Sequence, residues 1–324
     1  MTSPVIAPTP ETATTRRGGR LGAGGADRLS LLLVFIGVPL ALYVTFVIWP
    51  MLQAVVYSLT DWSGFTAGFQ FIGLGNYAQL MGDESFLIAI RNNLTMLVVM
   101  PLITLAIGFA LAIMVTIGGD MRGGVSGVKG AAFYRVAAFF PGVIPSIIVG
   151  IIFAQVYDPN NGILNGLLTG VGLEQFRSFA WLGDPATAMG ATVAAVVWAS
   201  AGFYMVLFVA AIRGIDTELF DAARLDGAGR VRIALSIVLP GIAKNVKSAY
   251  IYVGIAALDV FVFLQAFNPN GGPQRSTLGI TQEIYSAAFL DGRFGLACAM
   301  GVVLTLLTFI FVALVGLAGR IGRK

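Results

Sequence analysis

The sequence predicts an all-α integral membrane protein with six transmembrane helices, from its composition and from the length of its apolar runs. Apolar residues make up 57% of the 324 positions and charged residues only 11%, against about 25% charged in an average soluble domain. Because so few charges cannot cover the surface of a water-soluble fold of this size, lipid must surround much of the chain. The net charge of +4 lies mainly between the apolar runs, which favours membrane topology over nucleic-acid binding as its cause.

Six apolar runs match the roughly 20 residues of helix that cross the hydrocarbon core. Lipid offers no partner to an unpaired backbone group, so each run is predicted to be a helix. In chain order the runs are Ser30–Leu52, Leu94–Ile117, Ala132–Tyr157, Ala186–Ile212, Ala249–Phe267 and Phe294–Gly319. Pro141 and Pro145 interrupt the third run. Because each proline removes a helix hydrogen bond, a kink or break is predicted there.

The segments around these runs complete the predicted organisation. Residues 1–29 are rich in Thr, Pro, Gly and Arg, which predicts a disordered tail. The run over 30–52 is too long for the apolar part of a cleaved signal peptide and lacks an obvious small-residue cleavage site, so an uncleaved first helix is predicted. An outer loop over 53–93 then leads to a core of five helices over 94–319.

Lys and Arg residues are distributed unevenly between alternate loops. Sixteen of the 20 lie in the N-terminal tail, in the loops after the second and fourth runs, and at the C-terminus. The opposite loops hold only Arg91, Arg177, Arg275 and Arg293. Since cytoplasmic loops carry the excess of Lys and Arg, both termini are predicted to face the cytoplasm.

Side chains that carry catalysis are scarce. The chain has no histidine, which removes the usual general base and the commonest metal ligand. The one cysteine, Cys298, lies in an apolar run, which excludes an intramolecular disulfide and favours a structural thiol over a nucleophile. A membrane-embedded enzyme would need clustered nucleophiles, paired carboxylates or metal ligands. No catalytic, cofactor-binding or metal-binding residue is therefore predicted.

The loop after the fourth run, over 214–245, is long, charged and patterned. It reads GIDTELFDAARLDGAGRVRIALSIVLPGIAKN. Asp216 or Thr217 can cap a short helix that runs to about Leu225, and acidic residues in its first turns suit the helix dipole. Gly227 is predicted to end that helix in the left-handed conformation, which glycine adopts without penalty.

A second short helix is predicted to follow, and Pro240 marks the turn toward the fifth run. The product is a helix–turn–helix at the membrane face. Its first helix places Leu219, Ala222 and Ala223 on one face, where small alanines let another protein approach closely and Asp221 can pair with a cation. The alternative interpretation is a solvated connector with ordinary amphipathic packing.

These residues resemble the EAA loop of permeases from binding-protein-dependent ABC importers. The resemblance rests on the order and spacing of Asp221–Ala223, Gly227 and Ile237–Pro240, between the fourth and fifth of six helices. It implies a coupling helix that docks into a groove on an ATPase subunit and transmits its closure to the membrane helices. Asp221 stands where the family usually has glutamate, which keeps the charge and shortens the side chain by a methylene. The implied coupling residues are Asp221, Ala222, Ala223, Gly227, Leu239 and Pro240.

Two further segments resemble the carbohydrate-uptake branch of this family, the maltose and glycerol-phosphate type. One is Phe71–Tyr77 in the outer loop, and the other comprises Gly271–Pro273, Thr277 and Ile284–Phe289 before the last helix. Pro269 stands where that branch usually has a threonine. The resemblance implies the type I ABC importer permease fold, with helices two to six as a core and helix one reaching across to a second permease. It also implies import of a sugar or sugar-like solute across a prokaryotic inner membrane.

The partners follow from the same resemblance. It implies two ATP-binding cassette subunits, a second permease chain of different sequence, and an extracytoplasmic solute-binding protein. The sequence contains no G-x-x-x-x-G-K-[ST] loop, so ATP and Mg²⁺ are expected on the separate ATPase subunits. A secondary, ion-coupled transporter is the rival mechanism, and the lack of an evident duplicated half or a mid-membrane ion-binding constellation argues against it.

The solute path is predicted from a few polar and aromatic candidates. Asp259 lies mid-span in the fifth run, where an ionised carboxylate costs at least ~2.5 kcal/mol by insertion scales. It is therefore a candidate for the path, with a structural hydrogen-bonded acid as the alternative. Packing or interfacial anchoring is the ordinary role of membrane aromatics. The further candidates, which can stack on or hydrogen-bond to a sugar, are Trp198, Tyr204, Tyr252 and Gln265.

Overall fold

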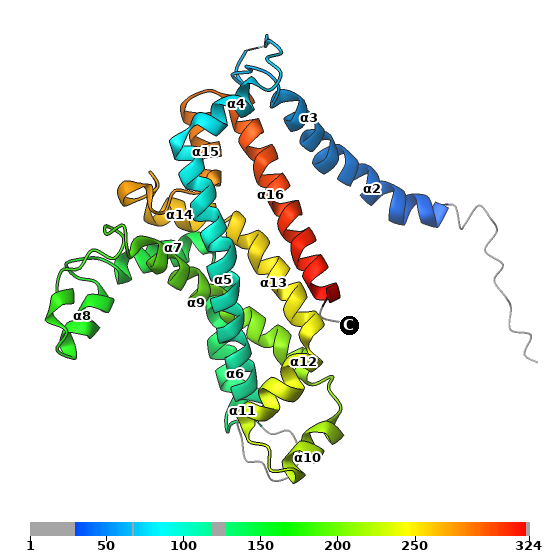
Figure 1. The fold of residues 1–324 in the computed structure, drawn as a ribbon, viewed down its shortest axis with the longest axis vertical. Helices are drawn as coiled ribbons and strands as arrows, with labels where there is room; N and C mark the ends of the chain where they lie inside the picture. The colour runs from blue at the N-terminus through cyan, green and yellow to red at the C-terminus, as the bar shows by residue number, and fades with distance from the viewer. Residues whose placement is uncertain (1–29, 67, 118–126, 322–324) are drawn as a thin grey trace, which may run out of the picture. The chain divides into compact units, whose positions relative to one another are not determined.

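The computed structural model describes residues 30–66, 68–117 and 127–321 (Figure 1). It separates the chain into one unit that ends at Gln53 and a second that begins at Ala54. The described residues form helices and contain no strand beyond an isolated bridge between Thr60 and Phe71. The predicted N-terminal tail lies outside the described residues.

The helices alternate between long spans and short connecting turns. Helix Ser30–Tyr57 contains η1 (Leu33–Gly37), α2 (Val38–Tyr43), η2 (Val44–Ile48) and α3 (Trp49–Tyr57). The elements that follow are α4 (Gly75–Gly82), α5 (Glu84–Ile117), α6 (Ala131–Phe139), η3 (Phe140–Val143), α7 (Ser146–Val156), α8 (Ile163–Gly170), η4 (Glu174–Phe176), α9 (Ala188–Ile212), α10 (Thr217–Leu225), α11 (Arg230–Ile233), η5 (Ala234–Val238), α12 (Leu239–Gly241), α13 (Ala243–Leu258), α14 (Phe261–Phe267), η6 (Pro273–Arg275), α15 (Ile280–Tyr285), η7 (Ser286–Leu290) and α16 (Phe294–Ile321).

Membrane spans account for most of the helical length. Four described helices are long and apolar enough to cross a membrane alone, namely Ser30–Tyr57, Glu84–Ile117, Ala188–Ile212 and Phe294–Gly319. Two bent pairs of helices qualify when each pair counts as one span, which gives up to 6. The predicted fold class, all-α with six spans, agrees with this arrangement.

The third predicted span is broken rather than merely kinked. Residues Ala131–Val143 and Ser146–Val156 meet at 99°. Pro141 lies in η3, and Pro145 precedes α7 and lacks the N–H that a continuous helix would need. Ile144 before it is extended, with ψ 129°, as a residue preceding proline prefers. The predicted proline break is therefore confirmed.

Two other spans begin earlier than predicted. The second span was expected from Leu94, but α5 starts at Glu84, where the Asp83 carboxylate accepts a hydrogen bond from Ser85 N at 2.9 Å and caps the helix. The fifth was expected as one helix from Ala249. It starts at Ala243 and divides into α13 and α14, which are bent by 45°.

The core of the second unit lies where α5 packs against α9 and α13 (Figure 1). Glycine permits the close approach of α5 to α9, because a Cβ on Gly108 would lie 3.1 Å from the carbonyl oxygen of Ala201. The contact of α6 with α9 is closer still, since a Cβ on Gly202 would lie 1.8 Å from the carbonyl oxygen of Ala138. Small residues thus permit the close helix packing expected in lipid.

Two neighbouring asparagines tie α5 to the last third of the chain. The fully buried Asn93 donates to Leu258 O at 3.2 Å and accepts from Ile280 N at 2.8 Å. Asn92 donates to Arg275 O and Leu278 O, each at 2.9 Å. These bonds fix the end of α13 and the start of α15 against α5.

Candidate functional site

The loop over 214–245 forms a short helix, α10, with complete end signals. The Asp216 carboxylate accepts from Glu218 N at 3.1 Å and caps the N-terminus. Glu218 in the first turn and Arg224 in the last turn both oppose the partial charges of the helix ends. The predicted helix from Asp216 or Thr217 to about Leu225 is confirmed.

The C-terminal end of α10 is a Schellman motif. Gly227 has φ +72° and donates to Arg224 O at 2.9 Å, while Ala228 N donates to Ala223 O at 2.9 Å. Ala223 and Ala228 both pack against the core, which supplies the apolar contact that accompanies this motif. The predicted left-handed glycine at Gly227 is therefore confirmed.

Phe220 anchors α10 to the body of the protein. Its side chain is 1% exposed and belongs to the same core cluster as Ile233 and Val238 from the following helix and Ile242 directly after that helix. That helix runs continuously from Arg230 to Gly241, one residue past the predicted turn at Pro240. A Cβ on Gly241 would lie 2.8 Å from the Ile215 side chain, so both ends of the loop pack together.

The outer face of α10 carries an acid and bare apolar surface. Asp221 and Arg224 form an ion pair at 3.1 Å, in which the side chain of Asp221 is 60% exposed and that of Arg224 only 13%. Leu219 is exposed, and Leu225 is 90% exposed. Leu219, Asp221 and Leu225 are therefore accessible to another protein.

The predicted coupling residues occupy different depths. Asp221, Ala222 and Gly227 are exposed, as are Leu239 and Pro240 on α12. Ala223 is half-buried against the core instead of sharing the exposed face with Leu219 and Ala222, because it lies three positions after the buried Phe220 on the same face of α10. Phe220 and Arg224 were missed from the sequence, although an aromatic residue within a charged helix was the available signal for Phe220.

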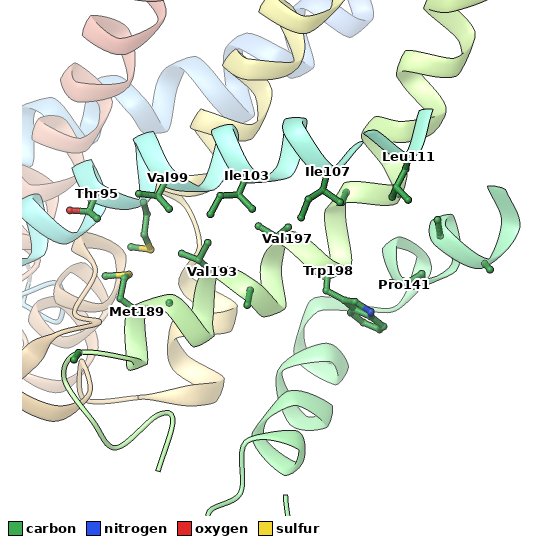
Figure 2. A pocket seen from close by; sticks show the side chains of 18 residues that line it. Thr95, Val99, Ile103, Ile107, Leu111, Pro141, Met189, Val193, Val197 and Trp198 are labelled. Carbon is green, nitrogen blue, oxygen red and sulfur yellow. The ribbon is translucent and has the colours of Figure 1, made fainter. Parts of the chain in front are cut away.

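A cavity of about 720 Å³ lies between α5, α9 and the end of α6 (Figure 2). On α5 its lining residues recur every fourth position, which is the i±4 ridge of a helix surface. They are Thr95, Val99, Ile103, Ile107 and Leu111. Val193, Val197 and Trp198 line it from α9, and Pro141 from η3. Only Trp198 among these residues was predicted from the sequence, although the spacing of four on α5 is visible there.

The cavity is almost wholly apolar. No charged residue lines it, and its few polar groups include the Thr95 hydroxyl and the Trp198 indole. Thr95 already donates to Arg91 O at 2.9 Å. Trp198 is partly exposed, with its ring 5.2 Å from that of Phe153 between centroids. This lining can pack against the apolar faces of a solute but offers few hydrogen bonds.

Asp259 lies within the fifth span, as predicted, but at the bend between two helices rather than inside one continuous helix. It is the exposed C-cap residue of α13, at the bend before α14. Its carboxylate makes no hydrogen bond or ion pair within the part of the chain that the structure describes. The prediction missed the bend because α13 and α14 read as one apolar run.

The remaining path candidates are dispersed. Tyr204 is buried in the core beside Gly108. Tyr252 is 68% exposed on α13. Gln265 on α14 accepts a hydrogen bond of 3.4 Å from Gln282 Nε2. Of these candidates, only Trp198 lines the cavity.

Comparison with known proteins yields matches in sequence and in structure. Residues 124–320 match the family described as binding-protein-dependent transport system inner membrane component. The chain is 50% identical over 321 residues to the diacetylchitobiose uptake system permease protein NgcF of Streptomyces coelicolor, covering 97% of this chain and 91% of that protein. It is 31% identical over 270 residues to the multiple sugar-binding transport system permease protein MsmF of Streptococcus mutans, covering 83% and 88%.

Among solved structures, the fold is similar to a chain of a bacterial alginate ABC transporter crystallised with an alginate pentasaccharide-bound periplasmic protein. The TM-score is 0.77 at 22% identity, and the match covers 92% of this chain and 96% of the other. At 22% identity, this similarity shows a shared fold alone.

Proposed function

Because the chain belongs to the family of binding-protein-dependent transport system inner membrane components, we propose that it lines the path by which a sugar or sugar-like solute crosses a prokaryotic inner membrane. Members of this family are permeases rather than enzymes, and they work with a solute-binding protein and an ATPase. The observation that carries the sugar class is the 50% identity to the diacetylchitobiose permease over nearly the whole chain. The 31% identical relative is also named for sugars.

The geometry of α10 supports a coupling role. Phe220 fixes the helix to the core, while Leu219, Asp221 and Leu225 face outward. A force applied to the outer face is therefore transmitted through a packed side chain rather than absorbed by a flexible loop. In the proposed mechanism, closure of the ATPase moves α10 and biases the membrane helices between two states.

The polarity of the cavity supports a second permease of different sequence. A sugar carries many hydroxyl groups, each of which needs a hydrogen-bond partner when it leaves water. The lining contributed by this chain is largely apolar, and a second copy would only add more of the same. A different chain can supply the missing polar groups. We propose two ATPase subunits, one for each permease, which bind the ATP and Mg²⁺.

The test is recovery of the complex and its transport activity. The tagged chain, expressed with its own transporter genes, is purified in mild detergent and its partners are identified by mass spectrometry. We expect an ATPase and a second permease with the native chain, and loss of the ATPase with Asp221→Lys, because the charge is reversed on the docking face. Uptake of labelled diacetylchitobiose should fall at least ~tenfold in the same variant.

The matched control is Glu174→Lys. Glu174 forms an exposed i, i+3 ion pair with Arg177, so this variant makes the same charge change in the same kind of pair on an opposite loop. It should keep both the ATPase and uptake. Recovery of the chain alone, or uptake unaffected by Asp221→Lys, would contradict the coupling role. Uptake of an unrelated solute with no uptake of diacetylchitobiose would contradict the sugar class.

A further inference from the structure

A second groove, of about 1210 Å³, lies between the start of α13 and the last turns of α16. Figure 1 shows these two helices side by side near the C-terminus. Two lysines, Lys244 and Lys247, line it from α13 together with Ser248. The wall from α16 is apolar and includes Val315 and Leu317. The groove thus joins a cationic end to an apolar wall.

Lys247 is held in place by its contact with α16. Its ammonium donates to Gly316 O at 3.0 Å. A Cβ on Gly319 would lie 2.5 Å from Lys247 Nζ and 2.9 Å from its Cδ, so glycine at this position leaves room for the lysine side chain. An ammonium has three donors and no acceptor. The bond to Gly316 leaves two donors for a ligand.

Among the described residues, no acid lines the groove to neutralise its positive charge. The ion pairs within the described residues join Arg177 to Glu174 and Arg224 to Asp221, so neither lysine is paired there. The N-terminus of the 16-residue helix α13 adds its positive partial charge. An anion bound in the groove would offset the positive charge of the two lysines and of the N-terminus of α13.

The apolar wall specifies the rest of the ligand. Leu317 is exposed on the same helix as Gly316, and α16 is an apolar span with little of its surface covered. A ligand for this groove therefore has a negative head and an apolar tail. Basic grooves between membrane helices at the water interface bind phospholipid head groups for this reason.

We propose that this groove binds an anionic phospholipid, with Lys244 and Lys247 holding its phosphate and the wall of α16 contacting an acyl chain. The bound lipid would brace α13 against α16 directly after the loop over 214–245, and α13 continues the chain from that loop.

The test uses the full chain in nanodiscs made from an equal mixture of phosphatidylcholine and phosphatidylglycerol. Native mass spectrometry measures how much phosphatidylglycerol stays bound to the protein after the protein is released from the nanodisc. Removing each lysine should weaken retention roughly fivefold, the effect of one cation near an anionic surface. Lys244→Gln should therefore retain less lipid than the native chain, and the double variant Lys244→Gln with Lys247→Gln should retain less again. Lys247→Arg keeps the charge and should retain it.

Lys129→Gln is the matched control, because Lys129 is an exposed lysine of another loop and does not line the groove. It should retain phosphatidylglycerol as the native chain does. In the assembled importer, a photoreactive benzoyl-phenylalanine in place of Ile251, another lining residue, should cross-link to phospholipid. Equal retention in all variants, displacement of the lipid by inorganic phosphate, or cross-linking of position 251 to a protein subunit would each overturn the proposal.

Discussion

Phe220 and Leu225 lie five positions apart on α10 and have opposite surroundings. Phe220 is 1% exposed and Leu225 is 90% exposed. We expect Phe220→Ala to lower the free energy of unfolding by about 3–5 kcal/mol, because it leaves a cavity in the core. Leu225→Ala should change stability by less than ~0.5 kcal/mol but weaken recovery of the ATPase. Thermal unfolding of the purified chain and quantitative pull-down measure the two effects.

The two variants serve as controls for each other. An equal loss of stability in both would mean that Leu225 also packs against the body of the protein. Full ATPase recovery with Leu225→Ala would move the docking surface away from the end of α10.

Gly227 is required by its backbone conformation alone. It has φ +72°, and a Cβ there would meet no atom within 4 Å. Gly227→Ala should therefore cost about 1–2 kcal/mol from strain, whereas Gly227→Pro should abolish uptake because it also removes the N–H that bonds to Arg224 O. Gly229, with φ −73° and open space around it, is the control. Thermal unfolding should be unchanged in Gly229→Ala, and an equal effect at both glycines would refute the strain argument.

At the scale of single elements, α15 contains Glu283, whose charged form is destabilised in the folded protein. Burial raises the pKa of the Glu283 carboxyl above its usual value of 4.5, and the charge of Asp83 raises it further, with Arg275 opposing and Asp291 adding to the shift. Between the unfolded and folded pKa values the native state binds the extra proton, so stability falls as pH rises through that interval. Above the folded pKa the destabilisation is complete.

Glu283→Gln should therefore stabilise the protein at neutral pH and remove this part of the pH dependence. The measurement is the melting temperature as a function of pH, for the native chain and the variant. Glu174→Gln, which changes an exposed surface pair, should leave the profile unchanged. Identical profiles for the native chain and Glu283→Gln would show that Glu283 is not destabilised by its neighbours.

The predicted helices differ from the observed ones mainly at the breaks within spans. The break in the third span was predictable, because Pro141 and Pro145 mark it in the sequence. The bend at Asp259 carries no proline or glycine, and the Asn93 side chain donates to Leu258 O directly before it. Local residue preferences contain no record of a contact with a residue 165 positions away.

At the scale of the whole molecule, Asp259 is the candidate that tests the solute path. It is exposed at the bend between α13 and α14. We expect Asp259→Ala to change the rate or the solute profile of uptake while the complex still assembles, because a carboxylate held outside a helix in a span is suited to face the path. Uptake of labelled sugars and pull-down measure the two readouts. Asp291→Ala, which removes an exposed acid outside the spans, is the control.

An unaltered rate and profile in Asp259→Ala would return this residue to a structural role. Loss of assembly would do the same, since the carboxylate would then be needed for folding rather than for transport.

The sequence by itself determined the membrane environment, the approximate spans, the family and the ends of α10. Each of these depends on local information, namely the length of an apolar run, a capping Asp216 or a glycine at 227, and the order of a motif. Only the tertiary structure decided that Phe220 and Ala223 point inward, that Trp198 lines the cavity while Tyr204, Tyr252 and Gln265 lie elsewhere, and that Lys247 meets α16. The physical reason is that burial and contact depend on segments that are distant in the chain. The order of residues within one segment does not indicate which distant segments pack against it.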